Sequence, residues 1–160
     1  MAAADLAQSY SSRLFIQDIN SFVTYLVDTG SDVSTTLANQ DELKLQPIKL
    51  LWAANGTPIR VFGERLIDLR IGLRRELKWV FLITDLETPI IGADFLESFD
   101  LSVDLKGKCL IDNLTGLKSS GEQRMTPAPE IKVIVEDTKW FQLVQKYPGI
   151  TNPTAKRKPV

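Results

Sequence analysis

The sequence predicts an all-β domain with one short helix. Short apolar runs follow one another along the 160 residues, and turn-forming residues separate them. The clearest alternation is in 61–71, where Ile67, Leu69 and Ile71 are separated by Asp68 and Arg70. Only one segment has a helical pattern, so the crossover helices that a doubly wound α/β fold requires are not predicted.

Turn residues place the elements along the chain. A turn at Asn20-Ser21 joins the first two strands. The next hairpin has Asn55-Gly56 at its tip, the pair that best tolerates the two positive φ angles of a type I′ turn. The helix follows Gly92, and a turn at Lys106-Gly107 joins the last two strands. The expected ranges are strands 12–19 and 22–27, hairpin 49–61, strands 61–71 and 77–84, helix 93–99, and strands 101–105 and 108–112.

A change in composition marks the predicted end of the domain. Five of the eight prolines lie after residue 120, and a polar Ser-Ser-Gly segment precedes them. We therefore expect a flexible leader over 1–11, a compact domain over 12–117 and a less regular tail over 118–160. Within the tail, 131–135 has the pattern of a strand and 140–147 that of a short amphipathic helix.

Composition excludes several classes of function. The formal net charge is −1, from 19 basic and 20 acidic side chains, which argues against nucleic-acid binding by this domain. With no His, neither a Ser-His or Cys-His nucleophile pair nor the usual zinc site can be assembled, and no cofactor or metal is expected. The single Cys109 cannot form an intrachain disulfide, so a reducing, cytoplasmic location is expected. The longest apolar runs have strand length, so no contact with a membrane is predicted.

Two motifs could carry chemistry. In Leu26-Val27-Asp28-Thr29-Gly30-Ser31, a carboxylate follows an apolar strand and precedes a glycine that permits a tight loop. On the tripeptide alone, an Asp that caps a turn is an equally good interpretation. The segment Pro89-Ile90-Ile91-Gly92-Ala93-Asp94 leads from a strand into the predicted helix, with Asp94 near its cap. Together with the Asn55-Gly56 hairpin between them, the two motifs form a specific pattern.

This pattern resembles the retropepsin-type aspartic proteases, and most closely the protease segment of gypsy-type long-terminal-repeat retrotransposon polyproteins. The resemblance covers about residues 12–113, and 146–153 is similar to the linker ahead of the reverse transcriptase in such polyproteins. It implies a closed β-barrel with a flap hairpin over 49–61. The sequence departs from the pattern of the viral enzymes at Ala93, the position at which those enzymes commonly have Arg.

The resemblance also implies a set of site residues. Asp28 would be the catalytic carboxylate, and Thr29 and Gly30 would hold the loop that presents it. The residues implied to contact substrate are Ser31, Asp32, Ala54, Asn55, Gly56, Thr57 and Ile90. The implied substrate is a retroelement polyprotein, processed inside the cell or in virus-like particles.

The chemistry requires two carboxylates, because one must act as base for water and the other as acid for the carbonyl oxygen. The chain has one Asp-Thr-Gly and no second copy, so we expect a two-fold homodimer that pairs two Asp28 side chains. Two alternatives stay open. One is a catalytically silent retropepsin-like module for dimerisation or peptide binding, and the other is a metal hydrolase that uses Asp28, Asp32 and Asp94.

Overall fold

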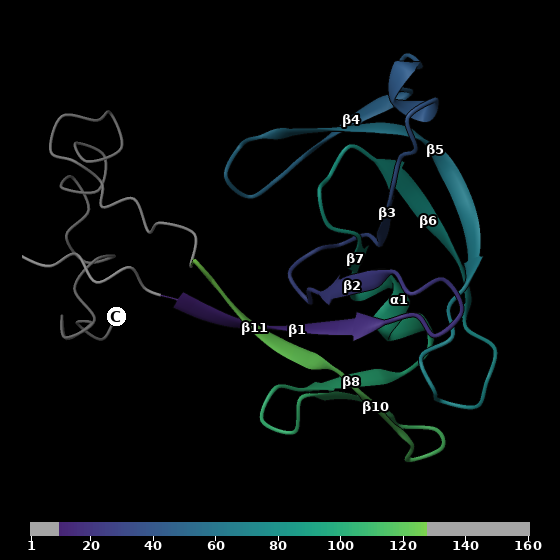
Figure 1. Ribbon diagram of the computed structural model, residues 1–160, viewed down its shortest axis with the longest axis vertical. Coiled ribbons are helices and arrows are strands. Elements are labelled where there is room, and N and C mark those ends of the chain that lie inside the picture. The colour runs from purple at the N-terminus through teal and green to yellow at the C-terminus, as the bar shows by residue number, and fades with distance from the viewer. Residues whose placement is uncertain (1–9, 128–160) are drawn as a thin grey trace, which may run out of the picture. The chain divides into compact units, whose positions relative to one another are not determined.

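The computed structural model describes residues 10–127, and they form two antiparallel-rich sheets and one short α-helix (Figure 1). An eight-stranded sheet has the order β11-β1-β2-β7-β3-β6-β5-β4, and a three-stranded sheet has the order β10-β9-β8. Neither helix in 10–127 is long and apolar enough to cross a membrane. The elements are β1 (Tyr10–Gln17), β2 (Thr24–Val27), β3 (Thr35–Leu37), the 3-10 helix η1 (Glu42–Lys44), β4 (Lys49–Trp52), β5 (Pro58–Asp68), β6 (Lys78–Thr84), β7 (Ile90–Ile91), α1 (Ala93–Ser98), β8 (Leu101–Asp104), β9 (Cys109–Asp112), β10 (Lys118–Ser120) and β11 (Glu122–Pro127).

Two parallel pairings bring distant parts of the chain together at the centre of the large sheet. β2 pairs with β7, with Val27 opposite Ile91, and β3 pairs with β6. β7 also pairs with β3 in antiparallel fashion. The segment after β2 therefore lies beside the segment that begins α1, although about 60 residues separate them in sequence.

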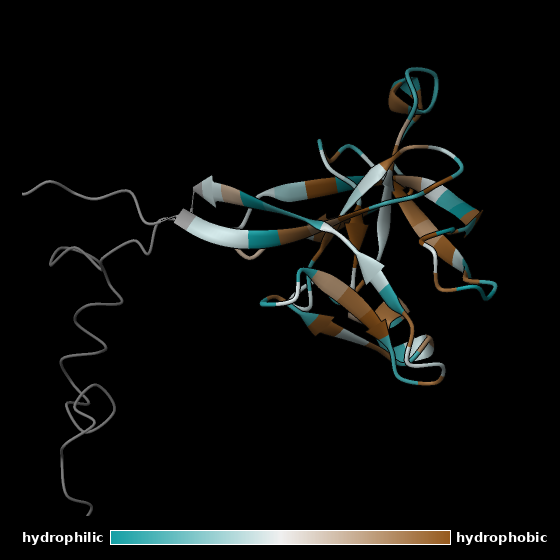
Figure 2. Cartoon of the chain, turned by 60° about the horizontal axis from the view of Figure 1, so that its bottom comes forward, coloured by the Kyte–Doolittle hydropathy of each residue, from teal (hydrophilic) through white to brown (hydrophobic). Residues whose placement is uncertain are grey.

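The core lies beneath these central strands. Three aromatic rings contact one another in tilted pairs. The ring centroids are 5.7 Å apart between Tyr25 and Phe81 and 5.9 Å apart between Phe81 and Phe95. Leu14 and Leu110, from the first strand and the small sheet, close the core on the other side. Hydrophobic colouring follows the strands of the body, and hydrophilic colouring gathers in the loops (Figure 2). Burial of this apolar surface is the main stabilising contribution to such a domain.

Most predicted elements are present, and the helix is found at Ala93–Ser98. The second flap strand and the following strand form one continuous element, β5, with an irregularity between Val61 and Gly63. This strand was predicted to end at Ile71, but it ends at Asp68. The chain then turns through 69–77, where its apolar side chains are still buried. The strand expected before Gly92 is β7, and the short elements β3 and η1 were not predicted.

The flap turn differs from the predicted type I′ turn. Gly56 has a φ of +79°, but Asn55 is not among the residues with positive φ. The Gly56 N–H donates to the Ala53 carbonyl at 2.8 Å, and the Ala53 N–H donates to the Thr57 carbonyl at 2.9 Å. This is a type I turn followed by a left-handed glycine, the usual three-residue hairpin connection. The Asn55 side chain accepts from the Thr57 N–H and favours this form.

Regular structure continues past the predicted boundary at residue 117. β10 completes the small sheet, and β11 lies beside β1 at one edge of the large sheet. The strand pairing of residues 10–127 leaves β11 and β4 as edges, so the sheet is open where a closed barrel was expected. The predicted leader up to residue 9 and the predicted tail elements at 131–135 and 140–147 lie outside the described residues.

Candidate active site

Asp28 is the first residue after β2, at the start of a tight loop. Its backbone N–H donates to the Ile91 carbonyl at 3.0 Å, which fixes the loop to β7. The Ser31 N–H donates to the Asp28 carbonyl at 3.1 Å and closes the turn. The Gly30 N–H donates to Oδ1 of the Asp28 carboxylate at 3.0 Å. The carboxylate is therefore oriented by its own loop and remains half exposed.

Two glycines let the loop take this shape. A Cβ on Gly30 would lie 3.3 Å from Oδ1 of Asp28, so a side chain there would crowd the carboxylate. A Cβ on Gly92 would lie 2.6 Å from the Val33 carbonyl oxygen and 2.9 Å from that of Ser31. Both contacts are with backbone and are shorter than real Cβ contacts allow. The backbone of the Asp28 loop therefore packs directly against Gly92, where a side chain would not fit.

The carboxylate of Asp94 accepts hydrogen bonds from side chains and backbone around the Asp28 loop. Its carboxylate accepts from the Ser34 hydroxyl at 2.7 Å and from the Ser34 N–H at 3.1 Å. The Trp79 indole N–H donates to it at 3.0 Å. Within residues 10–127, no three acidic or Cys side chains lie close enough to hold a metal ion. The alternative of a metal site shared by Asp28, Asp32 and Asp94 therefore has no geometric support.

The flap and the Asp28 loop line one cavity of about 360 Å³. The β4–β5 hairpin extends over the loops beside β2 and β7 (Figure 1). Apolar side chains form most of the wall, and Asp28 and Asp32 supply its charge. The residues that line it are Asp28, Gly30, Ser31, Asp32, Val33, Thr35, Leu51, Trp52, Ala53, Ala54, Ile59, Leu86 and Ile90. Such a cavity accommodates an apolar side chain next to the carboxylate.

The cavity contains some of the predicted site residues and adds others. Asp28, Gly30, Ser31, Asp32, Ala54 and Ile90 all line it, whereas Thr29, Asn55, Gly56 and Thr57 do not. The hairpin-tip residues are exposed beyond its rim. Leu51 and Ile59 were not predicted. They are directly paired on the flap strands, and the unbroken apolar run Leu50-Leu51-Trp52 has no alternation that would mark which flap face points inward.

An ion pair anchors the base of the flap. The Arg60 side chain donates to Asp85 at 2.8 Å, and the Arg60 backbone N–H donates to the same carboxylate at 2.9 Å. Burial by itself raises the pKa of Asp85, but these hydrogen bonds outweigh it and hold the pKa below the usual value. Asp85 precedes Leu86, so the ion pair also fixes a wall of the cavity.

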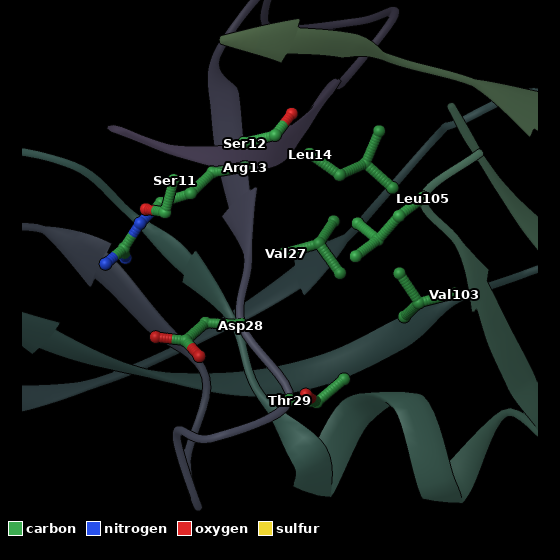
Figure 3. A pocket seen from close by; sticks show the side chains of 9 residues that line it. All are labelled: Ser11, Ser12, Arg13, Leu14, Val27, Asp28, Thr29, Val103 and Leu105. Carbon is green, nitrogen blue, oxygen red and sulfur yellow. The ribbon is translucent and has the colours of Figure 1, made fainter. Parts of the chain in front are cut away.

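A second hollow, of about 480 Å³, lies on another side of Asp28 (Figure 3). Leu14, Val27, Val103 and Leu105 gather on one side of it, while Arg13 and Asp28 lie together on the other. Thr29 belongs to this hollow and not to the cavity beneath the flap. Leu105 is 50% exposed, so an apolar surface is open to contact beside the carboxylate.

Known structures share this fold. No protein-family model and no curated protein sequence matches the chain. The crystal structure of the retroviral protease-like domain of Ddi1 from Leishmania major matches with a TM-score of 0.51 and 16% identity, over 77% of this chain and 99% of that one. EIAV protease complexed with the inhibitor HBY-793 matches with a TM-score of 0.40 and 20% identity, over 65% and 99%. The fold is retropepsin-like.

Proposed function

We propose that this chain is an aspartic endopeptidase whose active site is completed by a second copy. One observation carries the proposal: Asp28 is presented by a tight loop into a cavity that the flap hairpin also lines. The chain has no second Asp-Thr-Gly or Asp-Ser-Gly, so one copy supplies half of the catalytic pair. A two-fold axis beside Asp28 would supply the other half.

The proposed mechanism uses two Asp28 carboxylates that share one proton. Two carboxylates about 3 Å apart cannot both be ionised, as in aspartic proteases generally. The ionised Asp28 takes a proton from water as the water oxygen attacks the peptide carbonyl carbon. The partner's Asp28 gives its proton to the carbonyl oxygen. When the C–N bond breaks, the leaving nitrogen receives a proton from the pair.

The proposed substrate is an extended polypeptide. The apolar walls of the cavity suit an apolar side chain beside the scissile bond. The hollow lined by Leu105 and Thr29 supports the proposed dimer, because it leaves apolar surface exposed next to Asp28. From the motif resemblance, we propose that the natural substrate is the polyprotein of a gypsy-type retrotransposon, processed in the cytoplasm.

Hydrolysis of an unfolded polypeptide by the wild type and by Asp28→Asn tests this function. We expect cleavage by the wild type and loss of nearly all of it in the variant, because an amide cannot act as the base for water. Cleavage should persist in excess chelator. A folded, dimeric wild type with no turnover on a diverse peptide mixture would instead indicate the silent dimerisation or peptide-binding module.

A further inference from the structure

We propose that Ser34 and Asp94, backed by Trp79, are positioning residues that hold the Asp28 loop in its working shape. The inference rests on the proposed function, because it concerns the loop that presents the catalytic carboxylate. None of the three side chains lines the cavity. They act on Asp28 only through the backbone of its loop.

Ser34 is the buried end of the loop, where its carbonyl accepts from the Leu82 N–H at 3.1 Å and its side chain and backbone N–H make three further hydrogen bonds. Its hydroxyl accepts from the Gly92 N–H at 2.9 Å and donates to Oδ1 of Asp94 at 2.7 Å. Its backbone N–H donates to Oδ2 of Asp94 at 3.1 Å. One side chain thus connects the loop to both the glycine on which it rests and the first turn of α1.

The rest of the loop has little other support. Thr29, Gly30 and Asp32 are exposed, and the fully buried part of β2 ends at Val27. Beyond its own internal bonds, the loop is fixed by Asp28 N–H to Ile91, by the Ala93 N–H to the Ser31 carbonyl at 2.8 Å, and by Ser34. Removing the Ser34 contacts would leave a buried Gly92 N–H without a partner.

Asp94 is surrounded by donors only. Its carboxylate accepts from the Ser34 N–H and hydroxyl, from Trp79 Nε1 and from the Phe95 N–H. An ionised carboxylate satisfies all of them because it has acceptor sites alone. An amide of the same shape would turn an NH₂ group toward at least one donor. Asp94→Asn therefore breaks the cluster without changing its volume.

Trp79 fixes Asp94 from β6. Its indole N–H donates to Oδ2 at 3.0 Å, and its ring packs edge-on against Phe99 with centroids 6.0 Å apart. The side chain therefore contacts the first turn of α1 and the residue that follows the helix. Trp79→Phe keeps an aromatic ring at this place and removes the donor.

The experiment measures kcat, KM and the thermal midpoint for Ser34→Ala, Asp94→Asn and Trp79→Phe in the full chain. Thr115→Ala is the matched control, because the Thr115 hydroxyl also donates to a carboxylate, Oδ2 of Asp112, at 2.8 Å and lies outside both hollows beside Asp28. Amide hydrogen exchange at residues 28–34 is followed in the same samples.

We expect kcat to fall at least tenfold in Ser34→Ala and Asp94→Asn with KM changed less than about threefold, since a small displacement of a catalytic group weakens the transition state more than binding. Exchange over 28–34 should quicken in both. Trp79→Phe should show a smaller loss of the same kind, and Thr115→Ala should keep the wild-type kcat.

Unchanged kcat and unchanged exchange in Asp94→Asn and Ser34→Ala would overturn the positioning role. The positioning role would also be overturned if kcat fell only as far as the loss of thermal stability explains and fell equally in Thr115→Ala. A wild type without turnover would contradict the proposed function instead. In that case the exchange of residues 28–34 still decides whether these side chains hold the loop.

Discussion

At the scale of the single residue, the site depends on the absence of a side chain at Gly92. Any Cβ there meets backbone atoms of Val33 and Ser31 at 2.6–2.9 Å, and backbone cannot rotate away as a flexible side chain can. The loop that carries Asp28 would have to move instead. The position of this loop is therefore controlled by the absence of one methyl group.

Gly92→Ala should lower kcat/KM more than tenfold, a barrier change of about 1.4 kcal/mol or more, because it displaces the catalytic loop. Peptide turnover and the thermal midpoint are measured together. Gly63→Ala is the control, since its Cβ would lie 3.7 Å from Ile83 Cδ1, an ordinary contact. Wild-type kcat/KM in Gly92→Ala would show that the loop tolerates the shift.

At the residue scale, the sequence reveals only those groupings that are adjacent in the chain. Asp28 and the glycines beside it form a contiguous motif, so their spacing was visible in the chain. The contacts between Ser34 and Asp94 join residues 60 apart and depend on the pairing of β2 with β7. The indole bond of Trp79 to Asp94 has no signal in the local sequence.

At the scale of the element, the flap hairpin is a thin projection at the edge of the large sheet. β4 has no neighbour other than β5 within the described strands, and Trp52 is 68% exposed. The Asn55 and Gly56 tip is exposed and contributes nothing to the lining of the cavity. Such an element is stabilised by few contacts, so it can open and close.

Gly56→Val should reduce kcat/KM more than tenfold, about 1.4 kcal/mol in the barrier, while the thermal midpoint changes little. A β-branched residue is strained at a φ of +79°, and the strain falls on the element that is proposed to close over substrate.

Gly116→Val provides the matched control. Gly116 has a φ of +73° and, like Gly56, open space around a Cβ, but it lies in the turn between β9 and β10. We expect this variant to keep the wild-type kcat/KM. Equal losses of turnover in the two variants would mean that the flap is only a structural hairpin.

The longer elements were predictable because alternation and turn residues are local signals. β3 has three residues and β7 has two, and both are strands because they pair in parallel or across the chain with distant partners. The end of the domain was predicted too early. β10 and β11 are mostly polar in sequence, and it is pairing with β9 and β1 that makes them strands.

At the scale of the whole molecule, a buried ion pair joins the small sheet to the body. Asp112 is fully buried and accepts from Arg75 at 2.8 Å, and Arg75 also donates to the Phe99 carbonyl at 3.3 Å. Burial by itself raises the pKa of Asp112. Hydrogen bonds from Thr115 and Leu114 and the charge of Arg75 outweigh it and hold the pKa below its usual value.

Because the folded-state pKa of Asp112 is lowered, its ionised form stabilises the fold above about pH 4, and this contribution is lost as the pH falls through the folded-state pKa. Asp112→Asn should therefore lower the thermal midpoint at neutral pH by about 5–10 °C. The difference between variant and wild type should shrink as the pH falls below about 4. A constant difference across the pH range, measured by thermal unfolding, would remove this carboxylate as the cause.

The central claim is that two copies of Asp28 form one site, and mixing the wild type with Asp28→Asn tests it most directly. Total protein is held constant above the concentration at which sedimentation shows dimers, the subunits are allowed to exchange, and turnover is measured against the wild-type fraction. Mixed dimers lack one carboxylate, so an equal mixture should retain about one quarter of the wild-type rate. Retention of about one half, in direct proportion to the wild-type fraction, would show that each chain works alone and would contradict the shared site.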